Sequence, residues 1–219
     1  MAAGVHRSPP VIAGRVAAIV AAVAVVAAGP APAAAGDPDA GTIVGLGFGP
    51  GAVLGGALAD HFQAAGGTGR LRLGGRVGRI GYEITTSFAA LTGGDLAYPS
   101  YVLSTPSIAY YPLATPHLQT SVRAGLGYGA IGGDRPGPAP PCFDDGEPCP
   151  GPTTESISYP GYGLDLGANL QLHLGRRRGG RAVLWADVGL SMVRFQIADQ
   201  VVAGRVVLLT IGIAHGMEF

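Results

Sequence analysis

The stretch from Val206 to Phe219 constrains the fold of this 219-residue chain more than any other. From Val207 onward, every second position holds an apolar residue, an aromatic residue or a histidine, and the positions between are mostly small or polar. A two-residue period over about seven repeats is typical of a β-strand with two different faces. Because about 9–11 tilted residues span a bilayer, this strand is long enough to cross one.

The same alternation predicts seven further strands upstream. In Tyr162 to Leu174, for example, leucines alternate with glycine and polar residues. Pro106 removes a backbone donor and indicates a bulge. The alternation is also predicted to slip near Val193 to Phe195. The seven predicted strands are 42–49, 70–77, 80–91, 101–113, 120–131, 162–174 and 182–197.

The predicted connections alternate between long and short. Short turns are expected near residues 78, 116 and 177. The segment 57–69 begins with a short helical pattern, and the proline-rich segment 132–157 is predicted to be irregular. Long and short connections in alternation, with an even number of strands, are typical of an up-and-down transmembrane β-barrel. The long loops are predicted at 54–69, 92–100, 132–157 and 198–205.

The N-terminal segment, residues 1–35, has the three parts of a secretory signal peptide. Basic residues precede an apolar run from Val16 to Ala28, and the small residues Ala33 to Ala35 follow. This run is shorter than the ~20 residues of a spanning helix. We therefore expect residues 1–35 to be a signal peptide and residues 36–219 to be the mature domain.

Composition favours a membrane protein made of strands. The chain has no lysine, only 13% of its residues are charged, and no apolar run after residue 35 is long enough for a spanning helix. The 14 basic residues less Arg7 and Arg15 leave 12 against 14 acidic ones, a formal charge of −2, so no nucleic-acid partner is expected. Among structures made of strands, a closed barrel is the one in which every backbone N–H and C=O group within a bilayer has a hydrogen-bond partner.

The end of the chain resembles the closing strand of bacterial outer-membrane β-barrels, which typically ends in Phe with an apolar residue two places before, as Phe219 and Met217 do here. The pattern over residues 41–219 is similar to the eight-stranded family that includes the OmpA transmembrane domain and OmpX. The resemblance implies an all-β, eight-stranded antiparallel up-and-down transmembrane barrel in the bacterial outer membrane. It also implies outer-membrane lipid and the barrel-insertion machinery as partners, with Met217 and Phe219 as the insertion signal.

If the polar faces of these strands line the lumen, the charges on them are balanced. Four cations and four anions are expected to form a network there, because an unpaired buried ion costs several kcal/mol. An eight-stranded barrel leaves room only for side chains, which favours a salt-bridged plug, with a narrow channel as the alternative. The predicted network is Arg70, Arg72, Arg76, Glu83, Arg123, Asp165, Asp187 and Glu218.

Catalytic, metal and cofactor sites are not predicted. His173 and His215 lack the nearby serine of outer-membrane lipid A-modifying enzymes, so such an enzyme is only a second alternative. Asp144, Asp145 and Glu147 cluster without the ligand spacing of a calcium loop. A secreted lipocalin-like barrel, with its apolar face inward, is a third alternative.

Cys142 and Cys149 are the only cysteines and lie in the predicted loop 132–157. In an oxidising compartment they are expected to form a disulfide, which on the chain-entropy model stabilises a loop of this size by roughly 2.5 kcal/mol. A constrained external loop favours contact with a surface ligand of unknown identity. The sequence therefore predicts an integral outer-membrane barrel with a structural or surface-interaction role, and no enzymatic activity.

Overall fold

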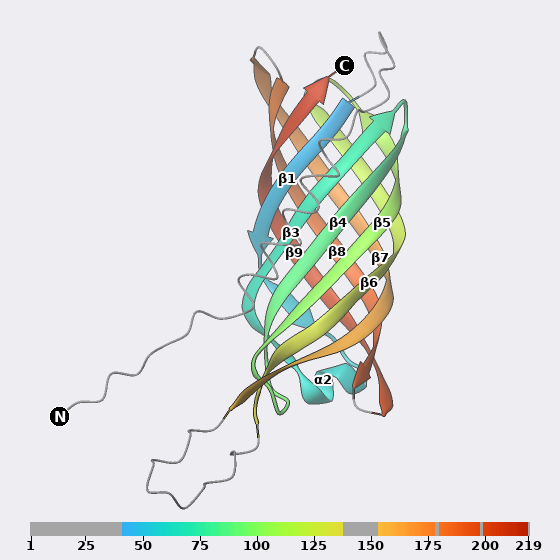
Figure 1. Cartoon of the computed structure of the whole chain (residues 1–219). Helices are drawn as coiled ribbons and strands as arrows, with labels where there is room; N and C mark the ends of the chain where they lie inside the picture. Colours follow the sequence, from blue (N-terminus) through green and yellow to red (C-terminus); the bar gives the residue numbers. More distant parts are fainter. Residues whose placement is uncertain (1–40, 138–152, 178–179, 198, 219) are drawn as a thin grey trace, which may run out of the picture. The chain divides into compact units, whose positions relative to one another are not determined.

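The computed structural model describes residues 41–137, 153–177, 180–197 and 199–218, and nearly all of them belong to strands of one sheet (Figure 1). No helix in these ranges is long and apolar enough to span a membrane. The described elements are β1 Gly41–Gly49, β2 Gly51–Val53, α2 Ala57–His61, β3 Gln63–Val77, β4 Ile80–Thr92, β5 Ala97–Ala114, β6 Leu118–Pro136, β7 Thr154–Arg177, β8 Gly180–Ile197 and β9 Gln200–Glu218.

The sheet closes on itself. Consecutive long strands pair antiparallel from β3 to β9, and β1 pairs with both β3 and β9. The short β2 also pairs with β9, in the same register as β1. Pro50 separates the two because it has no backbone N–H to donate, although its carbonyl still accepts from the Leu209 N–H at 3.0 Å. β1 and β2 therefore share one of eight positions in the ring, and the predicted eight-stranded antiparallel barrel is confirmed.

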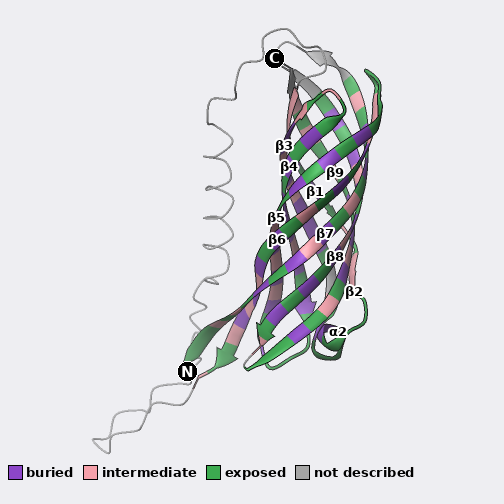
Figure 2. Ribbon diagram, turned by 90° about the vertical axis from the view of Figure 1, so that its right-hand side faces the viewer, coloured by how far each residue is buried: buried purple, intermediate pink, exposed green. Residues whose placement is uncertain are grey.

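The faces of the strands differ in the way the alternation predicted (Figure 2). Leucines, valines and tyrosines on one face are exposed, with Leu126 exposed to 75% and Ile213 to 73%. Arginines, carboxylates, serines and threonines on the other face are buried inside the ring. This is the reverse of a water-soluble barrel, whose apolar face turns inward. The lipocalin-like alternative is therefore wrong.

Strands at one end of the barrel run further than predicted, and all four predicted long loops are shorter. β3 begins at Gln63, β5 at Ala97 and β9 at Gln200. β6 continues to Pro136, and β7 begins at Thr154. The prediction ended each strand where the apolar alternation ended, but backbone pairing does not require apolar side chains.

Two local irregularities predicted from the sequence are absent. The register of β5 with β4 and β6 is unchanged across Pro106, whose ring points outward, so this proline marks no bulge. The described shifts between β5 and β6 lie instead near the two ends of β5. Val193 and Phe195 do not interrupt the alternation in β8, because both point into a part of the interior that is itself apolar.

Glycines on the inner wall provide space for large side chains from other strands. Trp185, the only tryptophan, is 1% exposed and lies against Gly45 and Gly47 of β1 and Gly212 of β9. A Cβ on Gly47 would come within 2.6 Å of the indole ring. The inward glycines at these positions are thus occupied by the ring of Trp185 and do not leave open space.

Replacing Gly47 with alanine should destabilise the barrel by about 1–3 kcal/mol, because the added methyl group overpacks the indole ring of Trp185. The matched control is Gly67→Ala, since a Cβ at Gly67 meets nothing within 4 Å. The urea midpoint of the detergent-refolded protein, followed by far-UV circular dichroism, should fall for Gly47→Ala only. Equal midpoints for the two variants would contradict this packing.

Candidate functional site

Four charged side chains meet in the middle of the barrel interior. Arg70 of β3 and Arg123 of β6 both form ion pairs with Asp187 of β8. The same two arginines approach Asp165 of β7, at 3.5 and 3.4 Å. Because β3 is not adjacent to β7 or β8 in the ring, the ion pairs of Arg70 cross the lumen. This central cluster contains two positive and two negative charges, and all four side chains are at most 1% exposed.

Two hydroxyl groups add hydrogen bonds to the central cluster. Arg70 Nε donates to Ser87 Oγ at 3.0 Å, and Ser191 Oγ donates to Asp165 Oδ1 at 2.6 Å. Each serine stands directly opposite its partner on the neighbouring strand. Two guanidiniums and two carboxylates compensate one another's charge in this way without contact with bulk water.

A second charged group lies beside Trp185. Arg72 binds Glu83 through two hydrogen bonds, at 2.7 and 3.2 Å, and Tyr111 donates to the same carboxylate at 2.9 Å. The guanidinium carbon of Arg72 is 5.5 Å from the centre of the Trp185 ring, a cation–π distance. This Arg72–Glu83 pair is also neutral overall, so each charged layer of the interior is internally balanced.

Glycines allow the arginines of the central cluster to lie flat against the wall. A Cβ on Gly167 would collide with the guanidinium of Arg123, and one on Gly189 would collide with that of Arg70. Both glycines belong to the strands that carry the two aspartates. Each of these strands therefore presents an aspartate to the interior and, two residues later on the same face, a glycine that leaves space for an arginine.

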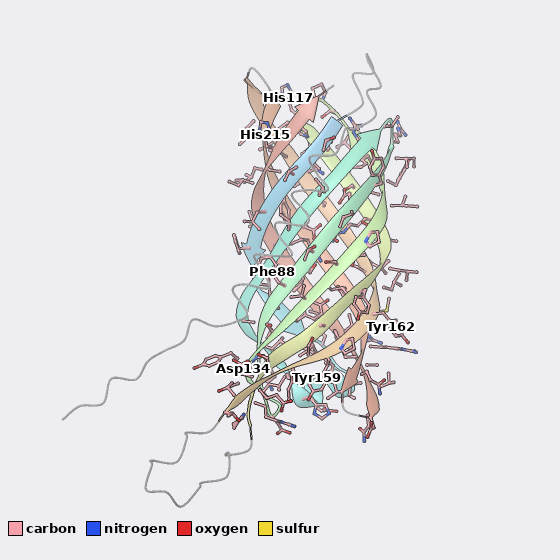
Figure 3. The ribbon with its side chains drawn as sticks, viewed as in Figure 1. Phe88, His117, Asp134, Tyr159, Tyr162 and His215 are labelled. Atoms are coloured by element: carbon pink, nitrogen blue, oxygen red, sulfur yellow. The ribbon has the colours of Figure 1, made fainter. Side chains whose placement is uncertain are left out.

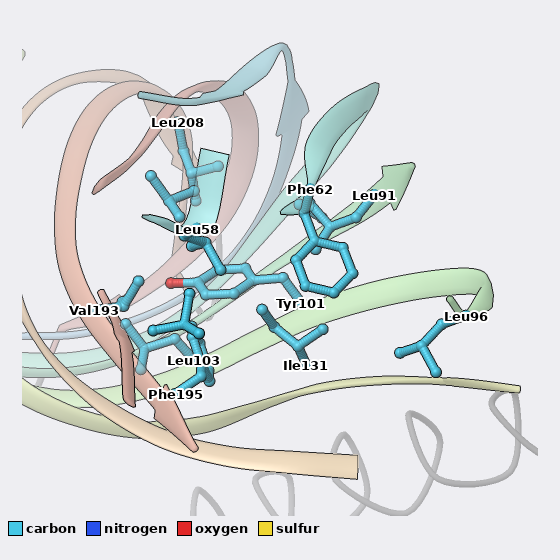
Figure 4. Close-up of a cluster of buried hydrophobic side chains, with 13 residues drawn as sticks. Leu58, Phe62, Leu91, Leu96, Tyr101, Leu103, Ile131, Val193, Phe195 and Leu208 are labelled. Carbon is cyan, nitrogen blue, oxygen red and sulfur yellow. The ribbon is translucent and has the colours of Figure 1, made fainter. Parts of the chain in front are cut away.

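The interior at the loop end is apolar. Figure 4 shows Tyr101, Leu103 and Ile131 of the wall packed with Leu58 of α2 and Phe62, which enter the mouth of the barrel. Val193, Phe195, Val202, Val206 and Leu208 belong to the same cluster. Sequence reasoning missed this cluster, although the apolar residues on both faces of β9 from Val206 to Leu209 signalled it. The cluster covers the charged layers at this end.

The predicted network residues have different positions. Arg70, Arg72, Glu83, Arg123, Asp165 and Asp187 are buried in the interior and take part in the two groups above. Arg76 is only partly buried, near the turn end, where Nη1 donates to the Gly78 carbonyl at 2.8 Å. The side chains of Glu218 and Met217, and residues Cys142, Cys149 and Phe219, lie outside the described part of the chain.

The histidines lie apart from the charged interior. His215 is exposed on the outer face near the turn end, His117 belongs to a turn there, and His61 ends α2 at the opposite end (Figure 3). His173 on β7 is partly buried, and its backbone N–H donates to the backbone carbonyl of His117 at 2.8 Å. Within the described ranges, no three His, Cys, Asp or Glu side chains gather as metal ligands.

Comparison with known proteins gives matches in fold. No family model and no curated protein matches the chain. Among solved structures, a major outer membrane protein from Thermus thermophilus is 14% identical, with a TM-score of 0.48, over 81% of this chain and 99% of that chain. Neisserial surface protein A is 11% identical, with a TM-score of 0.46, over 84% of this chain and 98% of that chain. The outer membrane protein OprG from Pseudomonas aeruginosa is 12% identical, with a TM-score of 0.42, over 83% of this chain and 97% of that chain. These likenesses to outer-membrane barrels concern the fold alone.

Replacing Asp187 with asparagine should destabilise the barrel by about 3–5 kcal/mol, because Arg70 and Arg123 would lose their shared buried carboxylate. The control is Asp95→Asn, which removes the partner of Arg135 in an ion pair whose side chains are 86% and 45% exposed. That change should cost less than about 1 kcal/mol. Urea unfolding in detergent measures both variants, and a similar small effect for each would show that the central cluster contributes nothing.

Proposed function

We propose that this protein is an integral barrel of the bacterial outer membrane with a structural and surface-interaction role. The observation that carries the proposal is the distribution of polarity: exposed leucines, valines and isoleucines cover the outside, while paired arginines and carboxylates fill the inside. In water such an exterior would associate, whereas in a bilayer it faces acyl chains. Signal-peptide export and delivery to the insertion machinery belong to the same proposal.

The height of the apolar band supports a membrane position. The outward residues of β7 from Tyr162 to Leu174 are apolar or aromatic throughout. These 13 residues extend for roughly 40 Å along the strand, or about 30 Å of height at a tilt of ~40°. The hydrocarbon core of a bilayer has about this thickness. Exposed tyrosines lie near both ends of the band, at Tyr82 and Tyr110 on one side and at Tyr128 and Tyr162 on the other.

The filled interior supports a structural role over that of a channel. The charged side chains of the central cluster neutralise one another across the lumen, and the apolar cluster covers them at the loop end. An ion that entered would have to break buried ion pairs or pass an apolar layer. Both steps are costly in a low-dielectric interior.

The β6–β7 hairpin supports a surface role. Residues 154–160 of β7 pair with β6 alone, beyond the last described pair with β8 at Gly161, so the ends of β6 and β7 bend away from β8 to one side of the barrel (Figure 1). On its outer face Ser156 Oγ lies 2.8 Å from Asp134 Oδ1, whereas Ile157 and Tyr159 of the same segment pack against the apolar cluster. In the sequence, the segment 138–152, with Cys142 and Cys149, connects the ends of these two strands. Contact with a surface ligand through this segment is part of the proposal.

Cysteine labelling on intact cells tests the location and orientation of the protein. After reduction, Cys142 and Cys149 should react with a maleimide polymer too large to cross the outer membrane, and without reduction they should not, because they form a disulfide. The control carries Thr115→Cys in a chain without the native cysteines, since Thr115 is exposed in a turn at the opposite end. Labelling of the Thr115→Cys control alone would show that the barrel has the opposite orientation. Equal labelling of Cys142 and Cys149 with and without reductant would exclude the disulfide.

Conductance in planar bilayers separates the structural role from the narrow channel. The refolded wild-type protein should give no steady conductance steps, because the two charged groups and the apolar cluster fill the lumen. Regular steps whose size changes in Arg72→Ser would favour the channel instead. Lipid A analysed by mass spectrometry, with and without the protein, should be unchanged, and a shifted mass would favour the enzymatic alternative.

A further inference from the structure

Two arginines interrupt the outer faces of β8 and β9, whose other described outward residues carry no permanent charge. Across the described outward faces of β3, β4, β5, β7, β8 and β9, Arg194 and Arg205 are the residues with a permanent charge. Both side chains are exposed, and neither forms an ion pair with a carboxylate in the described ranges. A guanidinium on a lipid-facing wall is costly unless it reaches the headgroup layer and a counter-charge there.

The strand register gathers specific neighbours around Arg194. Tyr128 of β6 stands opposite Tyr162 of β7, and Tyr162 stands opposite Arg194 of β8, so the three form one row on the outer face. Arg205 of β9 is opposite Met192, which places it diagonally beside Arg194. Diagonal neighbours of this kind have Cα atoms about 7–8 Å apart, within the joint reach of two arginine side chains on one anionic group.

The row borders a shallow hollow of about 290 Å³ on the outer wall. Its lining residues include two tyrosines, Arg194 and Gln196. Tyr162 lies on the outer surface in the half of the barrel nearer the loop end (Figure 3). The hollow therefore offers an apolar wall and a cationic edge at the border of the apolar band. The lining side chains are Tyr128, Pro160, Tyr162, Arg194, Gln196 and Val201.

We propose that Arg194 and Arg205, with Tyr128 and Tyr162, form a lateral binding site for the phosphate headgroup of an anionic lipid in the outer leaflet. Guanidiniums bind phosphate oxygens through paired, charge-assisted hydrogen bonds, and the tyrosine rings pack against the less polar part of the headgroup. The depth of the row matches such a ligand, since the outer face of β7 is apolar from Tyr162 toward the turn end and polar beyond Pro160. This inference rests on the proposed function, because it requires the loop end to lie at the outer leaflet.

Native mass spectrometry of the detergent-refolded protein, titrated with a diphosphorylated lipid A, tests the site. Arg194→Gln together with Arg205→Gln should weaken binding at least about tenfold, and dephosphorylation of the lipid should have a similar effect. The matched control is Arg135→Gln, an exposed arginine on the β6–β7 hairpin, which should bind as the wild type does. Unchanged binding by the double variant would overturn the proposal.

Two further measurements identify the ligand's source and separate this inference from the proposed function. Inorganic phosphate at millimolar concentration should not displace the lipid, and displacement that depends on Arg194 would assign the site to a free anion instead. Gel mobility before and after boiling should show that the double variant is folded. A wild-type protein that stays soluble without detergent would contradict the proposed function itself, whereas a folded double variant with full lipid binding would contradict the lateral site alone.

Discussion

The structure depends on closure of the sheet, through the pairing of β1 with β9. Closure pairs the backbone groups of every strand, which an open sheet in hydrocarbon could not do. It also divides the side chains into two environments, because successive residues of a strand point to opposite faces. Leucines then cover a surface that matches acyl chains, and every inward charge must find its partner within a narrow lumen. The two neutral groups around Asp187 and Glu83 are the result.

The narrow lumen in turn determines where glycine occurs. Trp185, Arg70 and Arg123 are too large to share the interior with side chains at every inward position, and each lies against glycines of the wall. The interior also changes character along its axis, from charged layers in the middle to the apolar cluster of Leu58, Phe195 and Leu208 at the mouth. Charge neutralisation, aromatic packing and apolar packing therefore act at different heights of one continuous core, and together they fill it.

The sequence predicted the strands, the closed barrel and the inward position of six charged residues because lipid imposes the strongest contrast between neighbouring residues. Where that contrast weakens, prediction failed. Val193 and Phe195 point into an apolar mouth while Arg194 and Gln196 point outward, so the apolar residues of β8 change from the outer to the inner face there and the alternation looked broken. The ends of β6 and β7 are polar or glycine on their outer face and rich in proline nearby, so they looked like loop. Pairing of Trp185 with Gly47 and Gly212 depends on cross-strand register, which a single sequence does not encode directly.

Heat-modifiability, combined with trypsin protection, tests the closed membrane barrel most directly. The chain contains no lysine, so trypsin can cut only at arginines, and those of the central cluster are buried. The detergent-refolded protein should migrate faster unboiled than boiled, and trypsin should leave a protected barrel fragment in the unboiled sample only. A protein that stays soluble without detergent, shows one mobility and is cut at Arg70 and Arg123 would contradict a closed barrel with its charges inside.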